Sequence, residues 1–268
     1  MLIRKHSLHP GRASGLGLAL LLMSTPSALM LSQPALASEF TVASPTTILS
    51  NDISTGDLDG ATDWQYERDS STKGEARGST LYPATVPSYD DAREFYMTYS
   101  NHGGERWFLS FGNDVNATHF VYDTYIYLVD PSQVQNLELD VNQVMSNGET
   151  VIFATECASG SKTWEYTIVK DGKDEWVNSN VGCDPRTWAA KKWHHVQIGV
   201  HRDSKGVVTH DWVDVDSTHS DFHDAVGSGA RKLGWPVGDL VINFQLDGYD
   251  SGKGEIMSYV HDLTVYRY

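Results

Sequence analysis

Cysteine, metal-binding motifs and long apolar runs are scarce in this chain. Only two of its 268 residues are Cys, and the sequence contains neither a His-Glu-x-x-His segment nor a paired Cys spacing. These absences argue against a catalytic zinc site, although the chain has 11 His residues. After residue 37 no apolar stretch is long enough to span a bilayer, so no transmembrane segment is expected in the mature chain.

Basic residues are also few. The 20 Lys and Arg stand against 35 Asp and Glu, which gives a formal net charge of −15, and no run of Lys or Arg forms a basic patch. Such a chain repels nucleic acid and anionic lipid headgroups, and it disfavours polyanionic substrates such as alginate or pectate. The charge balance therefore favours a neutral ligand and excludes nucleic acid as a partner.

The first 37 residues have the pattern of a signal peptide. Arg4, Lys5 and Arg12 precede an apolar run over residues 16–31, and Ala-Leu-Ala at residues 35–37 forms a small-residue cleavage site. We therefore predict a secreted protein, periplasmic or extracellular, whose residues 38–268 form a single domain.

The two cysteines follow this export signal. Cys157 and Cys183 would meet an oxidising compartment, which favours a disulfide between them. A disulfide that closes a loop of this length would stabilise the folded state by about 3 kcal/mol, because it reduces the conformational entropy of the unfolded chain.

Short strands separated by turns fill most of the chain. Strands are expected where β-branched and aromatic residues cluster: residues 120–129, 151–155, 163–169, 175–178, 194–202, 207–215, 240–246 and 257–266. Residues 90–98 carry the one hint of a helical turn, and residues 38–80, rich in small polar residues, are expected to begin as an extended arm. The pattern predicts an all-β fold, a β-sandwich of two antiparallel sheets.

Two carboxylates alternate with apolar residues in the segment Leu-Glu-Leu-Asp-Val-Asn-Gln at residues 137–143. Alternation places Glu138 and Asp140 on one face of a strand, which is either a solvated face or a site. The segment resembles the signature strand of laminarinases and lichenases, Glu-x-Asp-x-Glu or its bulged form Glu-x-Asp-x-x-Glu. The resemblance implies a concanavalin A-like β-sandwich in which the first Glu is a nucleophile and the last an acid/base. Here that last position holds Asn142 or, in the bulged form, Gln143, and an amide cannot act as the acid.

The turn after this strand sets its pairing. Asn147-Gly148 favours a two-residue hairpin turn, which would place Asp140 opposite Thr155 and Glu138 opposite Cys157. In that register Glu156 lies on the other face of the sheet, so it is a poor substitute for the missing acid.

A second likeness covers roughly residues 115–268. The segment Trp-His-His-Val-Gln-Ile at residues 193–198, the returning strand at 211–215 and the closing Val-His-Asp-Leu-Thr-Val at 260–265 resemble laminin G-like and concanavalin A-like domains. Residues 116–123, Asn-Ala-Thr-His-Phe-Val-Tyr-Asp, together with the Glu-x-Asp strand, are similar to exported bacterial proteins of this superfamily. This likeness implies a fold and not a reaction.

Aromatic and amide side chains supply further ligand-binding candidates. Trp164 and Trp176 lie on consecutive predicted strands, where they would stack on sugar rings or fill the core. Gln245 and Asp247 end another strand and would bind sugar hydroxyls through bidentate hydrogen bonds.

A structural calcium ion is a further implication of the resemblance, because concanavalin A-like domains often carry one near the chain ends. Asp59 and Asp262 are the candidate ligands, since their hard oxygen atoms suit Ca²⁺. No other cofactor is required.

Together these features predict a secreted protein that binds a neutral polysaccharide on the concave sheet of a β-sandwich. The candidate ligand-binding residues are Glu138, Asp140, Asn142, Gln143, Trp164, Trp176, Gln245 and Asp247. One alternative is a divergent endo-glycosidase of the laminarinase type, with Glu138 as nucleophile and Asp140 beside it. Another is a surface or adhesion protein without a sugar site.

Overall fold

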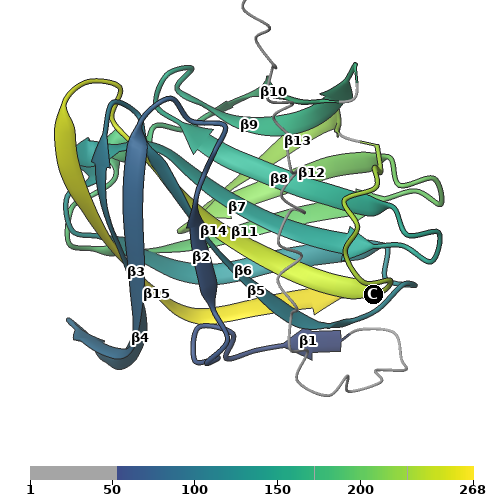
Figure 1. The fold of residues 1–268 in the computed structure, drawn as a ribbon, viewed down its shortest axis with the longest axis horizontal. Helices are drawn as coiled ribbons and strands as arrows, with labels where there is room; N and C mark the ends of the chain where they lie inside the picture. Colours follow the sequence, from purple (N-terminus) through teal and green to yellow (C-terminus); the bar gives the residue numbers. More distant parts are fainter. Residues whose placement is uncertain (1–52, 172, 228) are drawn as a thin grey trace, which may run out of the picture. The chain divides into compact units, whose positions relative to one another are not determined.

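The computed structural model describes residues 53–171, 173–227 and 229–268, which form two stacked β-sheets (Figure 1). The predicted signal peptide and the first part of the predicted arm, residues 38–52, lie outside the described residues. The prediction that one domain begins at residue 38 stays a prediction. In the part of the chain that is described, no helix has the length and apolar character of a membrane span.

The larger sheet has eight strands, in the order β13-β12-β11-β6-β15-β4-β3 with β1 beside β15. Its strands are β1 (Ile53–Thr55), β3 (Glu75–Val86), β4 (Tyr89–Ser100), β6 (His119–Leu128), β11 (Trp193–Arg202), β12 (Val208–Val215), β13 (Thr218–Val226) and β15 (Lys253–Arg267). The predicted helical turn at residues 90–98 is wrong. These residues belong to β4, whose backbone is paired with β3 on one side and β15 on the other.

The second sheet has seven strands, in the order β10-β9-β8-β7-β14-β5-β2. Its strands are β2 (Gln65–Arg68), β5 (Gly104–Asn113), β7 (Val134–Val144), β8 (Thr150–Ala158), β9 (Thr163–Lys170), β10 (Lys173–Gly182) and β14 (Asp239–Gly248). Short 3-10 helices, η1 (Pro131–Gln133) and η2 (Pro185–Thr187), lie in the connections. Both sheets are antiparallel, which confirms the predicted all-β fold, a β-sandwich of two antiparallel sheets.

Apolar side chains from both sheets meet between them. Phe95 of β4 stacks on Phe244 of β14 with ring centroids 4.7 Å apart, and Trp107 of β5 lies 5.1 Å from Phe95. All three are fully buried. The alternation of apolar and polar residues along each strand therefore turns one face of each sheet to this shared core and the other face outward.

The predicted disulfide is present. Cys157 near the end of β8 is bonded to Cys183, which follows β10, with a Cα–Cα distance of 5.3 Å. It joins the end of the β7–β8 hairpin to the loop before η2.

The turn between β7 and β8 differs from the prediction and changes the pairing. Met145 and Glu149 are hydrogen-bonded across a three-residue turn, Ser146-Asn147-Gly148, in which Gly148 has a φ of +77°. The extra residue shifts the register by one, so Glu138 faces Glu156 and Asp140 faces Ala154. The predicted pairs with Thr155 and Cys157 are wrong, and Glu156 lies on the same face as Glu138.

Candidate functional site

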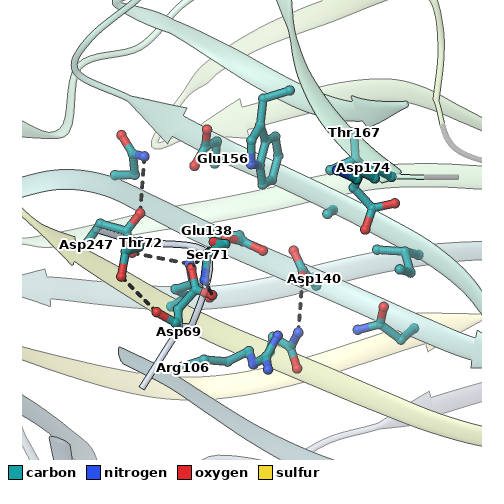
Figure 2. A pocket seen from close by; sticks show the side chains of 18 of the residues that line it. Asp69, Ser71, Thr72, Arg106, Glu138, Asp140, Glu156, Thr167, Asp174 and Asp247 are labelled. Atoms are coloured by element: carbon teal, nitrogen blue, oxygen red, sulfur yellow. Dashed lines mark hydrogen bonds between the residues drawn. The ribbon is translucent and has the colours of Figure 1, made fainter. Parts of the chain in front are cut away.

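A groove of about 600 Å³ lies on the outer face of the seven-stranded sheet. Strands β5, β7, β8 and β14 form its floor, residues of β9 and β10 line one side, and residues 69–72 and 231–235 add to the rim. Figure 2 shows carboxylates from several of these strands directed into the same space.

Strand alternation explains why this floor is polar. Leu137, Leu139 and Val141 of β7 turn to the core, so Glu138 and Asp140 between them turn to the groove. The other floor residues that β7 and β14 contribute are polar as well: Asn136, Asn142, Asn243, Gln245 and Asp247.

Hydrogen bonds cross between these two strands. Asn243 Nδ2 donates to Asp140 Oδ2 at 3.0 Å, because the two residues are directly opposite in the sheet. Asp247 accepts from Asn136 Nδ2 at 3.3 Å and from Gln245 Nε2 at 3.2 Å. The predicted Gln245 and Asp247 thus share one hydrogen-bonded network with Asn136 of β7.

Two predicted ligand-binding residues do not reach the groove. Strand β7 is regular through Val144, so Gln143 points inward, is fully buried and accepts a hydrogen bond from Arg202 Nε at 2.5 Å. Its amide donates to the carbonyl oxygens of Asp114 and Ala117, both at 2.8 Å. Trp164 pairs with the inward-facing Cys157 and fills the core.

Trp176 does line the groove, as predicted. It pairs with Thr167, another lining residue, and 37% of its surface is exposed. Trp235 also lines the groove. It lies in the long connection between β13 and β14, where no strand periodicity marked it as a groove residue.

Sequence reasoning also missed Glu156, Arg106 and Asp69. Glu156 is 3% exposed and directly opposite Glu138. Arg106 of β5 faces Gln245, and Asp69 accepts a hydrogen bond from Gln245 Nε2 at 3.3 Å. Only the correct hairpin register identifies Glu156 from the sequence, and only the pairing of distant strands brings in the other two.

Burial and mutual repulsion raise the pKa of these carboxyl groups. Burial raises the pKa of Glu138 well above its usual value, and the neighbouring charges of Asp140 and Glu156 raise it further. Burial likewise raises the pKa of Glu156, and that of Asp247 to about 7. The pKa of Asp140 rises to about 6 through burial, against the hydrogen bonds it accepts. The floor can therefore both donate and accept hydrogen bonds near neutral pH.

The cations of the groove do not balance its acids. Arg106 pairs with Glu67, and Arg231 pairs with Asp174. Among the described residues, no Lys, Arg or His nitrogen forms an ion pair within 4.0 Å with Glu138, Asp140 or Glu156. This excess of acid disfavours a polyanionic ligand.

The calcium candidates lie elsewhere. Asp59 and Asp262 line a separate cavity with Asp57, Asp91 and His261. Asp59 Oδ1 accepts from the backbone N–H of Leu263 at 3.0 Å. Over the described residues, no group of three or more His, Cys, Asp or Glu is placed to hold a metal ion. Calcium binding stays a prediction.

Comparisons with known proteins give matches to solved structures alone. No protein-family profile and no curated protein matches the sequence. A carbohydrate-binding module of the β-sandwich superfamily is similar at 10% identity and a TM-score of 0.40, over 77% of this chain and 56% of that protein. A β-glucanase of Bacillus licheniformis has 12% identity and a TM-score of 0.37, over 80% and 97%. A family 11 carbohydrate-binding module of Clostridium thermocellum has 11% identity and a TM-score of 0.36, over 80% of this chain and 94% of that protein.

Proposed function

We propose that the groove binds a neutral polysaccharide and that the protein is an exported carbohydrate-binding protein. The observation that carries this proposal is the groove floor, in which buried carboxyl and amide groups surround an open space beside Trp176. Vicinal sugar hydroxyls need both donors and acceptors, and a pyranose face packs against an indole.

One amide of the floor lacks a partner. Asn142 is 2% exposed, and its Nδ2 makes no hydrogen bond in the structure. A buried polar atom without a partner is rare and destabilising. A ligand hydroxyl that accepts a hydrogen bond from this Nδ2 would therefore remove the cost of leaving it unpaired.

Affinity electrophoresis in gels that contain soluble glucan, xylan or galactan tests this proposal. We expect at least one neutral polysaccharide to retard residues 38–268, and alginate and pectate not to do so. Asp140→Ala should weaken that binding by about 1 to 3 kcal/mol, because a hydroxyl would lose its buried partner.

Asp123→Ala is the matched control, because Asp123 lies on β6 of the other sheet and binds His195 and Gln197. It should leave affinity unchanged. Equal retardation of wild type and Asp140→Ala would contradict the groove assignment. Absence of retardation by every neutral polysaccharide would favour the adhesion alternative.

A further inference from the structure

Three glutamates form a row across neighbouring strands of the groove sheet, and we call them the acidic row. Glu138 of β7 is directly opposite Glu156 of β8, which is directly opposite Glu165 of β9. Adjacent strands lie about 4.8 Å apart, so the three carboxyl groups are lateral neighbours. Figure 2 shows the first two of them over the floor of the groove. Like charges directly opposite each other destabilise a sheet, so such a row needs protons or a positive charge beside it.

The next row along the same strands carries one acid and then short side chains. Asp140 of β7 is directly opposite Ala154 of β8. The same register continues to Thr167 of β9, which pairs with Trp176 of β10. All four residues line the groove. Three strand spacings, or about 14 Å of floor made of short side chains, therefore separate the carboxyl group from the indole, which leaves room for a short sugar chain.

The cations that line the groove do not neutralise the acidic row. Arg106 pairs with Glu67, and Arg231 pairs with Asp174. Lys173 is exposed at the first position of β10. Among the described residues, no ion pair within 4.0 Å reaches any of the three glutamates of the row. The fold thus gathers buried acids in an open groove and supplies no positive charge in contact with them.

Protons compensate for part of this missing charge. Burial and the neighbouring acids raise the pKa of Glu138 and of Glu156 well above the usual value. Burial also raises the pKa of Asp140, but hydrogen bonds from Glu138 and Asn243 hold it at about 6. At neutral pH Asp140 is therefore a carboxylate that lies beside protonated acids.

We propose that the groove takes a glycan with a free amino group, whose ammonium binds Asp140 beside Glu138 and Glu156. This inference rests on the proposed function, because the ammonium belongs to a sugar chain bound in the same groove. An ammonium offers three N–H donors and no acceptor, which suits a site made of carboxyl oxygens, and its hydrogen bonds to carboxylates are among the strong ones. The positive charge favours the ionised form of the neighbouring acids, so their protons pass to the solvent on binding.

Two further groups of the groove favour a sugar over another amine. Trp176, at the far end of the floor, is 37% exposed and offers a platform for a sugar ring. Asn142 lines the groove, is 2% exposed, and its Nδ2 has no hydrogen-bond partner. It lies two residues beyond Asp140 on the same strand face, about 7 Å away. A sugar hydroxyl can accept from this Nδ2, whereas a protonated linear polyamine has no acceptor to offer.

Three β-1,4-linked trisaccharides that differ only at carbon 2 test the proposal. Cellotriose carries a hydroxyl there, the glucosamine trimer an ammonium, and the N-acetylglucosamine trimer an acetamido group. In isothermal titration calorimetry of residues 38–268 at about pH 6, we expect the glucosamine trimer to bind roughly 10-fold or more tightly than either neutral trimer. Its binding should release protons, seen as a dependence of the heat on the ionisation enthalpy of the buffer. Spermidine, which has the charge without the sugar, should bind more weakly.

Variants separate the charge of the site from the charge of the whole chain. Asp140→Asn keeps the shape of the side chain and should reduce the preference for the ammonium over the hydroxyl to roughly twofold or less. Glu156→Gln should reduce the number of protons released. Glu255→Gln is the matched control, because it removes one negative charge from β15 of the other sheet, where Glu255 accepts from Tyr96. It should keep the full preference. Thermal melting checks that every variant is folded.

The outcomes are distinct. Equal affinities of cellotriose and the glucosamine trimer overturn the ammonium site and leave the proposed function standing. A preference that survives Asp140→Asn, or spermidine binding as tight as that of the glucosamine trimer, also overturns it. Binding of the glucosamine trimer in a protein that no neutral glycan retards supports the ammonium site and overturns the neutral ligand. If neither kind of glycan binds, both proposals fail.

Discussion

The two faces of β7 place adjacent amides in opposite situations. Gln143 on the inner face is fully buried, and both ends of its amide have partners: it donates to two carbonyl groups and accepts from Arg202. Asn142 on the outer face is almost as buried, yet its amide nitrogen has none. Two amides of nearly equal burial therefore differ in hydrogen-bond satisfaction, and the one without a partner for its nitrogen faces the groove.

The same contrast applies to charge. The inner face holds Arg202, whose guanidinium donates to the carbonyl oxygens of Val115 and Ala117 as well as to Gln143. The outer face gathers carboxyl groups that raise one another's pKa. Burying several acids side by side lowers stability, and the rest of the sandwich has to offset this cost.

The largest expected effect comes from the inner face. Gln143→Ala should lower the free energy of unfolding by about 3 to 5 kcal/mol, because it opens a cavity and removes a partner from a buried guanidinium. Asn142→Ala should lower it by less than about 1 kcal/mol and should weaken glycan binding instead. Urea unfolding and affinity electrophoresis on both variants check this. Similar stability losses in the two variants would contradict the comparison.

A smaller effect concerns pH and the outer face. Burial raises the pKa of Asp247 from 3.8 to about 7, so between these values the folded state binds more protons than the unfolded state. The stabilisation of the folded state by this protonated carboxyl is therefore at its full value below about pH 4, and it is lost as the pH rises through about 7.

Asp247→Asn isolates this contribution. The difference in unfolding free energy between variant and wild type should shift by about 2 to 4 kcal/mol in favour of the variant from pH 4.5 to pH 7.5. Asp171→Asn, in the exposed turn after β9, is the matched control. A pH-independent difference for Asp247→Asn would show that the carboxyl is not held protonated by the fold.

Sequence patterns predicted much of this structure because strands and their faces depend on local alternation. The polar face of residues 138–142 and the strand ending at Asp247 were both recognisable, and both line the groove. Register was not, because Asn147-Gly148 favours a two-residue turn but also fits the observed three-residue turn, in which Gly148 supplies the positive φ, and a shift of one residue moves Glu156 to the other face of the sheet.

The two tryptophans show where alternation stops being informative. Trp164 and Trp176 have similar neighbours in sequence, but pairing turns Trp164 to the core beside Cys157 and Trp176 to the groove beside Thr167. Which face a strand buries is settled by its partners in the sheet, and these lie outside any local window.

The smallest expected effect comes from Trp176, the tryptophan that faces the groove. Trp176→Ala should weaken binding of the retarding polysaccharide by about 1 kcal/mol, or roughly fivefold in Kd, because one aromatic platform for a sugar ring is lost. The free energy of unfolding of this variant should differ from that of the wild type by less than about 0.5 kcal/mol, since Trp176 is 37% exposed. Tyr66→Ala is the matched control, because Tyr66 is an exposed aromatic residue of the same sheet that does not line the groove. If Trp176→Ala and Tyr66→Ala bind the glycan equally well, the indole of Trp176 does not contact the ligand, and the groove binds through its polar floor alone.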